Sequence, residues 1–450
     1  MFCQLDRLRR CLSPRIRQAL NELPETLDET YERTLLDIGE ENWAYAHRLF
    51  QCIVVALRPL RVEELAEYLA FKSDTGGGLT FQRDWRPKNP RDTVLSTCSS
   101  LISIVNVGGS AVMQFSHFSV KEYLTSSRIA EGRVSRYYIP LEPAHIFVTQ
   151  ACLSILLQLD DHVTGRGIEE LPLARYAGRY WTKHGKFGDV ASHTEDLMKR
   201  LFNPENHHFA NWVQIHDTFD YGRQKPLHYA AYHGFHRVVE WLITTRPQDA
   251  NVLGFNDRTP FHTASRYGQF MVVQVLLKHH ADVNVVTRNI WTPLHQASWE
   301  GHSKVARLLL EHGADVNSKN MSSETPLHLV SEGSGNLEVA QLLLEHGADP
   351  SIRCKYGRDP LYRAILVGHE GLVQLLLKHG ADPRTLDEDG RTLLHVSSQK
   401  GHLEVTQRLL ELGVDVNSRN HQGQTPLQVA SKNDENLVMQ LLLRHGAERT

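Results

Sequence analysis

The 450-residue sequence lacks the features that define several large classes of protein. Its six cysteines are scattered without a C-x-x-C pair, which favours free thiols in a reducing compartment over a disulfide framework. The longest wholly apolar run near the start, residues 52–57, is far shorter than the roughly 20 residues that a membrane-spanning helix needs. The N-terminus also has no apolar core of a secretory signal. These absences indicate a cytoplasmic protein, with the nucleus as the alternative compartment.

Motifs that carry chemistry are missing as well. The sequence has no G-x-x-x-x-G-K-[ST] loop to hold phosphates, and no G-x-S-x-G or supported Cys/His pair for nucleophilic catalysis. The glycine-rich stretch 75–80 contains no lysine and predicts a flexible loop, while the pair Glu63-Glu64 is interpreted as ordinary solvated charge. The sequence therefore predicts a protein that is not an enzyme and uses no metal or cofactor.

What the second half does contain is a repeat. Its period is 33 residues, or 34 where one residue is inserted. Each unit begins with a Thr-Pro pair or its equivalent and ends with a tail of the type His-Gly-Ala-Asp. The seven starts are Lys225-Pro226, Thr259-Pro260, Thr292-Pro293, Thr325-Pro326, Asp359-Pro360, Thr392-Leu393 and Thr425-Pro426.

The clearest unit, residues 291–317, explains how such a segment folds. Thr292 is a good helix N-cap, and Pro293 follows at the first helical position, where it has no N–H to lose. Gly301 can adopt the left-handed conformation that ends a short inner helix. The apolar residues at 305–309 then recur at helical spacing and predict an amphipathic outer helix. One helix pair cannot bury its apolar face alone, so the units are expected to stack into a solenoid.

The period and the T-P-L-H start resemble those of the ankyrin repeat, over residues 220–450 as seven units. This resemblance implies a mostly α-helical solenoid that binds proteins through its turn tips and the exposed ends of its inner helices. Tyr362 replaces the motif histidine, Lys225 is a poor cap, and the insertion at 332–336 is expected to distort the concave face of its unit. The polar last unit, where Gln428 replaces the histidine, suits a terminal cap.

The repeat also accounts for most of the 26 histidines, which otherwise suggest a metal site. Five of them occupy the T-P-L-H slot, where the imidazole can bond the backbone and the capping hydroxyl. Equivalent residues of successive units form a ladder one repeat apart, whereas zinc requires a convergent shell of ligands. The five are His228, His262, His295, His328 and His395.

The first half divides into three predicted parts. These are a helical linker region over residues 1–40, a domain over residues 41–130 and a helical connector over residues 131–219. The middle part reads as three helices, two strands around Gly108-Gly109 and a further helix. This order is typical of a winged-helix domain.

Several local predictions accompany this division. Capping boxes are expected at 26–29 and at 119–122, and residues 72–91 are expected to form a polar loop. Trp181 and Trp212 are interpreted as core residues of the connector. The first box is expected to open a helix with Leu27, Tyr31, Leu35 and Ile38 on its apolar face, and the second to carry Phe118 and Tyr123 at staple positions.

The first half resembles the region that follows the NACHT module in fungal NACHT–ankyrin proteins, which are signalling ATPases related in plan to NOD-like receptors. The phrases that carry the resemblance are CQLDRLRRC (3–11), LPETLDETYERTL (23–35), RPLRVEELAEYLAF (58–71) and FSHFSVKEYLTS (115–126). The resemblance implies the sensor or scaffold part of such a protein without its NTPase. A fragment of an ATP-hydrolysing receptor with an upstream module is the alternative.

A third candidate function is an ankyrin regulator of transcription. The candidate recognition helix, however, carries Glu63, Glu64 and Glu67, which would repel phosphates, and the formal net charge of −3 argues against non-specific nucleic-acid binding. We therefore expect no nucleic-acid partner.

The expected partner is a protein bound on the concave face of the array, or the N-terminal part folded back on that face. Trp, Tyr and Arg are enriched at interface hot spots, and Trp291 and Trp299 occupy slots that the scaffold does not require. Carried over by register, the predicted binding residues are Tyr232, Arg258, Arg266, Tyr267, Arg288, Trp291, Trp299, Glu300, Tyr356 and Arg358.

Overall fold

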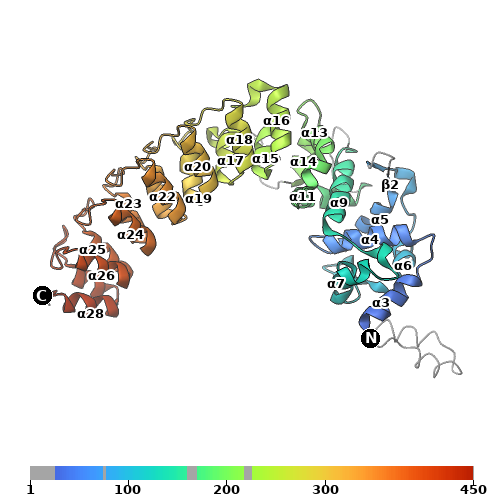
Figure 1. The fold of residues 1–450 in the computed structure, drawn as a ribbon, viewed down its shortest axis with the longest axis horizontal. Coiled ribbons are helices and arrows are strands. Elements are labelled where there is room, and N and C mark those ends of the chain that lie inside the picture. The colour runs from blue at the N-terminus through green and yellow to red at the C-terminus, as the bar shows by residue number, and fades with distance from the viewer. Residues whose placement is uncertain (1–25, 74–77, 160–169, 217–224, 449–450) are drawn as a thin grey trace. The chain divides into compact units, whose positions relative to one another are not determined.

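The computed structural model describes residues 26–73, 78–159, 170–216 and 225–448 (Figure 1). The chain forms two compact units, residues 1–220 and 221–450. Predictions for residues 1–25 and for the glycine-rich loop at 75–77 lie outside the described residues. The described part is mostly α-helical, as predicted, with small sheets in the first unit. Of its helices, none combines the length and the apolar character that crossing a membrane requires.

The first unit begins with helix α3 (Leu27–Leu36). Thr26 caps it by accepting a hydrogen bond from the Glu29 N–H at 3.2 Å. Leu27 is 47% exposed because it lies at the first helical position beside the cap, so the prediction that places it on the buried face is wrong. The other three residues of that face are buried as predicted: Tyr31, Leu35 and Ile38.

Three helices and a three-stranded antiparallel sheet follow. Their bounds are α4 (Trp43–Val55), β1 (Leu60–Arg61), α5 (Val62–Glu67), α6 (Pro90–Cys98), β4 (Ile102–Val107) and β5 (Ser110–Phe115). Strands β4 and β5 form the predicted hairpin, which Gly108 and Gly109 turn with φ angles of 57° and 81°. Strand β1 pairs with the other edge of β5, with Leu60 opposite Met113, so the strand order is β1-β5-β4.

The segment predicted as one polar loop contains regular structure. Strands β2 (Phe71–Ser73) and β3 (Leu79–Phe81) pair antiparallel, and the ring centroids of Phe71 and Phe81 lie 5.2 Å apart. The 3-10 turn η3 (Arg83–Trp85) follows. The loop prediction is wrong here because three-residue strands are too short to show an alternating apolar pattern.

Helix α7 (Phe118–Leu124) also begins differently from the prediction. Its cap is His117, whose Nδ1 accepts a hydrogen bond from the Ser119 N–H at 3.3 Å, so Ser119 lies inside the helix. Tyr123 is buried, but Phe118 is 72% exposed. The predicted capping box and staple at this helix are therefore wrong.

Two carboxylates of α5, Glu64 and Glu67, are buried, which corrects the interpretation of Glu64 as a solvated charge. Glu64 accepts two hydrogen bonds from the Arg58 guanidinium, each at 2.7 Å, and Glu67 accepts one from Arg86 at 2.6 Å. Of the three acidic residues expected to repel DNA, Glu63 alone is exposed. The repulsion argument against DNA binding therefore rests on that single residue.

The helices of the connector surround an aromatic core. Trp181 and Trp212 are fully buried, as predicted, and meet edge to face with centroids 5.4 Å apart. The main helices are α9 (Leu141–Leu156), α11 (Leu173–Gly185), α13 (Glu195–Phe202) and α14 (His208–His216). Shorter elements of the first unit are η2 (Tyr68–Ala70), η4 (Ser99–Leu101), α8 (Ser127–Ala130), η5 (Ser135–Tyr137) and α12 (Val190–His193).

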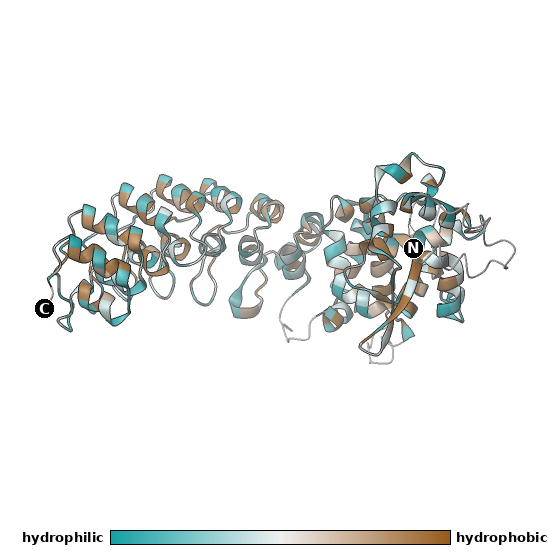
Figure 2. Ribbon diagram, turned by 90° about the horizontal axis from the view of Figure 1, so that it is seen from below, coloured by the Kyte–Doolittle hydropathy of each residue, from teal (hydrophilic) through white to brown (hydrophobic). Residues whose placement is uncertain are grey.

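In the second unit, the described residues form seven helix pairs that stack side by side (Figure 1). Inner helices pack on inner helices and outer helices on outer helices, and Figure 2 shows their apolar sides in brown. The inner helices are α15 (Pro226–His233), α17 (Pro260–Arg266), α19 (Pro293–Glu300), α21 (Pro326–Glu332), α23 (Pro360–Val367), α25 (Leu393–Lys400) and α27 (Pro426–Lys432). The outer helices are α16 (His236–Thr245), α18 (Phe270–Lys278), α20 (Ser303–Glu311), α22 (Leu337–Glu345), α24 (Glu370–Lys378), α26 (Leu403–Glu411) and α28 (Asn436–Arg444), with 3-10 turns η6 (Pro247–Asp249) and η7 (Phe255–Asp257).

The helix ends follow the predicted chemistry. Thr292 accepts a hydrogen bond from the His295 N–H at 3.3 Å, and Gly301 ends the helix with a φ of 80°. In the last pair, the Gln428 side chain takes the place of the motif histidine and accepts a bond from the Thr425 N–H at 3.0 Å. A side-chain cap and a left-handed glycine thus set the length of α19, α23 and α25.

The inserted residue at 332–336 is accommodated in a turn, and Gly333 at the end of α21 has φ and ψ angles of −88° and −104° in place of the left-handed conformation of Gly301. The Ser334 N–H donates to the Trp299 carbonyl at 3.1 Å, and Asn336 caps the next outer helix by accepting from the Val339 N–H at 3.0 Å. Helix α21 still packs on both α19 and α23.

Candidate protein-binding site

The turn tips that join neighbouring repeats form a regular row. The tip before α19 is closed by the Thr287 N–H, which donates to the Trp291 carbonyl at 3.0 Å. Adjacent tips are also joined, since the Arg288 N–H donates to the Asn256 carbonyl at 3.2 Å. Because each backbone is held within its tip and by its neighbour, the side chains project from fixed positions. We call the surface formed by these tips and the adjoining ends of the inner helices the tip face.

Buried histidines of the inner helices form hydrogen bonds to the backbone of the tips. The His262 Nε2 lies 2.9 Å from the Trp291 carbonyl, which can only accept, so Nε2 carries the proton. Nδ1 then accepts from the Thr259 N–H at 3.3 Å and from its hydroxyl at 2.9 Å. Burial lowers the pKa of His262 to about 4, which keeps the ring neutral. The same contacts recur at His295, His328 and His395, as predicted for this slot.

A cavity of 170 Å³ opens on the tip face between the second and third helix pairs. Four predicted binding residues line it, and the two tryptophan rings meet edge to face with centroids 6.1 Å apart. Pockets for drug-sized ligands are larger, about 300–1,000 Å³, so this cavity suits one or two side chains of a partner. Its lining comprises Arg258, Arg266, Trp291, Trp299, Asn256, Thr287, Asn289 and Gln296.

Both tryptophans are half-buried, so part of each ring contributes to the packing of the array. Trp299 packs against Gly333 of the next repeat, where an added Cβ would lie 3.0 Å from the ring Cδ2 and 2.7 Å from the Trp299 carbonyl. Glycine at this position makes room for the ring. The rest of each ring is available to the cavity.

The rim of the cavity carries a chain of polar and aromatic contacts. Arg266 of α17 pairs with Glu300 of α19 at 3.3 Å, and its guanidinium lies 5.8 Å from the centre of the Tyr267 ring. Tyr267 meets Tyr232 of the preceding repeat edge to face, with centroids 4.5 Å apart. These contacts join three successive inner helices and orient their exposed ends.

The remaining predicted residues lie outside the cavity. Arg288 is exposed and pairs with Asp257 of the preceding tip at 3.1 Å. Arg358 lies two tips beyond Trp291, and its guanidinium is 5.8 Å from the Tyr356 ring centre and 5.1 Å from that of Tyr362. The structure thus gathers eight of the ten predicted residues on adjoining tips and helix ends, while Tyr356 and Arg358 form a separate cluster.

One cluster on this face was not predicted. Arg363 of α23 is buried and pairs with Glu324 at 2.5 Å and with Glu332. In the repeat register, Leu329 and Val396 occupy the same slot on the neighbouring inner helices. An arginine between two repeats that carry apolar residues at this slot is the sequence signal that could have revealed the cluster.

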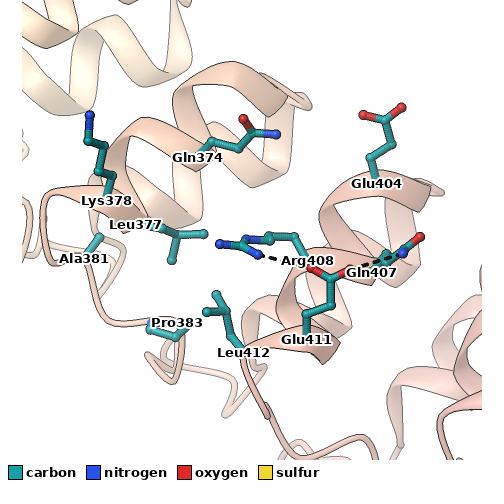
Figure 3. A pocket seen from close by; sticks show the side chains of 10 residues that line it. All are labelled: Gln374, Leu377, Lys378, Ala381, Pro383, Glu404, Gln407, Arg408, Glu411 and Leu412. Carbon is teal, nitrogen blue, oxygen red and sulfur yellow. Dashed lines mark hydrogen bonds and ion pairs between the residues drawn. The ribbon is translucent and has the colours of Figure 1, made fainter.

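The array has a second, larger cavity between outer helices α24 and α26, with a volume of 700 Å³ (Figure 3). Three of its polar residues bond along α26, since Glu411 accepts from Arg408 at 3.1 Å and from Gln407 at 3.2 Å. No aromatic side chain is among its lining residues. Within the described ranges, no group of three or more His, Cys, Asp or Glu side chains is placed to hold a metal ion.

Comparison with known proteins places this geometry in a family. Residues 190–287, 227–320, 316–387 and 368–450 match the model for ankyrin repeats in three copies. The chain is 32% identical to "Azaphilone pigments biosynthesis cluster protein L" of Monascus ruber over 58% of this chain and 61% of that protein. It is also 30% identical to the ankyrin repeat domain of Bcl-3, a member of the IkappaB protein family, with a TM-score of 0.44 over 49% of this chain and 98% of that chain.

The match to the Monascus ruber protein spans about three fifths of that protein's length. The family match is broader, because its segments run without interruption from residue 190 to residue 450, more than half of the chain. The chain belongs to the ankyrin-repeat family.

Proposed function

We propose that this chain is a non-catalytic scaffold that binds a partner protein through the tip face of its ankyrin array. The observation that carries the proposal is the cavity lined by Trp291, Trp299, Arg258 and Arg266. The backbone of the tips that line this cavity is held by hydrogen bonds within each tip and to the neighbouring tip. Few groups therefore have to be ordered when a partner binds.

The lining defines the chemistry of the partner. Two indole rings offer apolar surface, and two guanidiniums stand beside them, of which Arg266 is paired with Glu300 at the rim. An apolar side chain with an acidic neighbour fits this combination. Tyr232, Tyr267, Arg288 and Glu300 would contact the partner around the rim, and the cluster of Tyr356 and Arg358 would extend the interface along the row of tips.

For the first half, we propose a winged-helix domain of the kind that follows a NACHT module. The strand order β1-β5-β4, with α4 before β1 and α5 and α6 before the hairpin, supports this assignment. We accordingly divide the chain into a linker region (1–40), the winged helix (41–130), a connector (131–219) and seven repeats (220–450). The protein would act in a signalling assembly in the cytoplasm or nucleus without nucleic acid, and its own N-terminal part is an alternative occupant of the tip face.

A second candidate function follows from the relative in Monascus ruber, whose name places it in a pigment-biosynthesis cluster. The scaffold would then bind a protein encoded by such a cluster. The two candidates differ in the identity of the captured protein, whereas the binding surface is the same in both.

The test is capture of partner proteins by the full chain and by the variant Trp291→Ala/Trp299→Ala. We expect the variant to lose the specific partner, because interface tryptophans of this kind contribute about 2 kcal/mol or more to binding. The matched control is Trp85→Ala/Phe118→Ala, which removes two exposed aromatic side chains from the first unit. Equal capture by the wild type and both variants would refute the assignment of the site.

A further inference from the structure

The first unit contains a basic cavity that the proposed scaffold function does not use. It measures 540 Å³ and lies among β1, the β4–β5 hairpin and helices α11 and α14. Among the residues that the structure describes, four arginines line it and Glu64 is the only acidic lining residue, which gives these residues a net charge of +3. The arginines are Arg58, Arg61, Arg175 and Arg179.

On one side of this cavity, Arg58 and Arg61 are held in place by hydrogen bonds to Glu64. The buried Glu64 accepts both bonds of the Arg58 fork at 2.7 Å, and it accepts further bonds from Arg61, through the backbone N–H at 2.8 Å and through Nε at 3.0 Å. The Arg58 guanidinium also lies 5.1 Å from the centre of the Tyr176 ring. These four bonds occupy the acceptor sites of Glu64 and hold Arg58 and Arg61 in place.

On the other side of the cavity, the described lining contains two arginines and no carboxylate. Arg175 and Arg179 are exposed, stand four residues apart on α11 and line the same cavity. No ion pair involving either residue occurs in the part of the chain that the structure describes. Like charges at this spacing destabilise a helix, and a bound anion would remove that cost.

The remaining lining indicates what kind of anion would fit. Val107, Val112 and Ile215 add apolar surface beside the guanidiniums. The volume lies within the range of small-molecule pockets, about 300–1,000 Å³, and exceeds what one inorganic ion needs. Guanidinium forks match phosphate oxygens in pairs.

We propose that this cavity binds a small molecule carrying two phosphate groups, with Arg175 and Arg179 as its direct ligands and Arg58 and Arg61 as fixed charge behind them. The phosphate groups would neutralise the net positive charge of the lining, and any organic part would lie against the apolar side. A bare diphosphate and a phosphorylated metabolite share this chemistry.

The experiment measures binding of inorganic pyrophosphate and of fructose 1,6-bisphosphate to the full chain by calorimetry at constant ionic strength. We expect at least one to bind, and the variant Arg175→Gln/Arg179→Gln to bind it about tenfold more weakly or worse. The variant should melt at or slightly above the wild-type temperature, because it loses a like-charge pair. Tighter binding of the bisphosphate would identify the organic source of the phosphates, and tighter binding of pyrophosphate the inorganic one.

The matched control is Arg83→Gln/Arg133→Gln, which removes the same charge from exposed positions of the first unit outside the cavity. This control should bind like the wild type. Equal weakening in both variants, unchanged affinity in the Arg175/Arg179 variant, or no binding of either compound would overturn the proposal. None of these outcomes depends on the tip face, so the proposed scaffold function is tested separately.

Discussion

At the scale of single residues, the buried histidines make the array sensitive to acid. His262, His295 and His328 have pKa values lowered to about 4 by burial, against an ordinary value of 6.5. The unfolded chain therefore takes up protons below pH 6.5, while the folded chain does so only near pH 4. Stability from these residues is complete above pH 6.5 and is lost as the pH falls toward 4, by about 3 kcal/mol per histidine at most.

The substitution His328→Gln tests this account, because Gln428 shows that glutamine can accept the same backbone N–H without titrating. We expect the variant to be about 1 kcal/mol less stable at neutral pH, since its bond to the Arg358 carbonyl is altered. Between pH 6.5 and 4 it should lose less stability than the wild type, as measured by urea denaturation at each pH. An unchanged pH dependence would contradict the assigned role.

The buried Arg363 gives a second prediction at this scale. Arg363→Ala leaves Glu324 and Glu332 without their shared partner and should lower the free energy of unfolding by about 2–3 kcal/mol. Arg363→Leu should cost less, because Leu329 and Val396 fill the same slot in the neighbouring repeats. Urea denaturation of the two variants compares these costs, and equal losses would contradict this prediction, because they would show that an apolar side chain in the slot recovers no stability.

At the scale of elements, the seven helix pairs could be predicted because the signals are local. A cap such as Thr292, a glycine such as Gly301 and a 3.6-residue apolar period lie within one unit. Strands β2 and β3 could not be predicted, since Phe71 and Phe81 meet across ten residues and show no period of their own. The start of α7 was misplaced because His117 can accept a backbone N–H as serine does, which the sequence pattern does not reveal.

The packing of Trp299 leads to a prediction about the turn after α21. Gly333→Ala would place a Cβ 2.7 Å from the Trp299 carbonyl and 2.9 Å from the Leu329 carbonyl, two backbone atoms that cannot rotate away. We expect a loss of about 1–3 kcal/mol in thermal or urea denaturation, with weaker partner binding because the ring must shift. The matched control Gly132→Ala meets nothing closer than 3.5 Å and should be nearly neutral.

At the scale of the whole molecule, the repeat register predicted which residues share the tip face, but it did not predict that some of them enclose a cavity. Trp291 and Trp299 come together because one ends a tip and the other ends the inner helix that follows it, which the register shows directly. The cavity between them also needs Arg258 and Arg266 from the previous repeat and the space that Gly333 leaves in the next one. Such contacts between repeats depend on side-chain packing and cannot be predicted from the sequence of a single repeat.

The central claim is that a protein partner binds across the second and third helix pairs of the array. Hydrogen exchange of the full chain, with and without the captured partner, measures this directly. We predict that the partner slows exchange in the tips around residues 254–258 and 287–291 and at the ends of α17 and α19, while outer helices α18 and α20 are unchanged. Slower exchange confined to the outer helices, or to residues 26–216, would contradict the account.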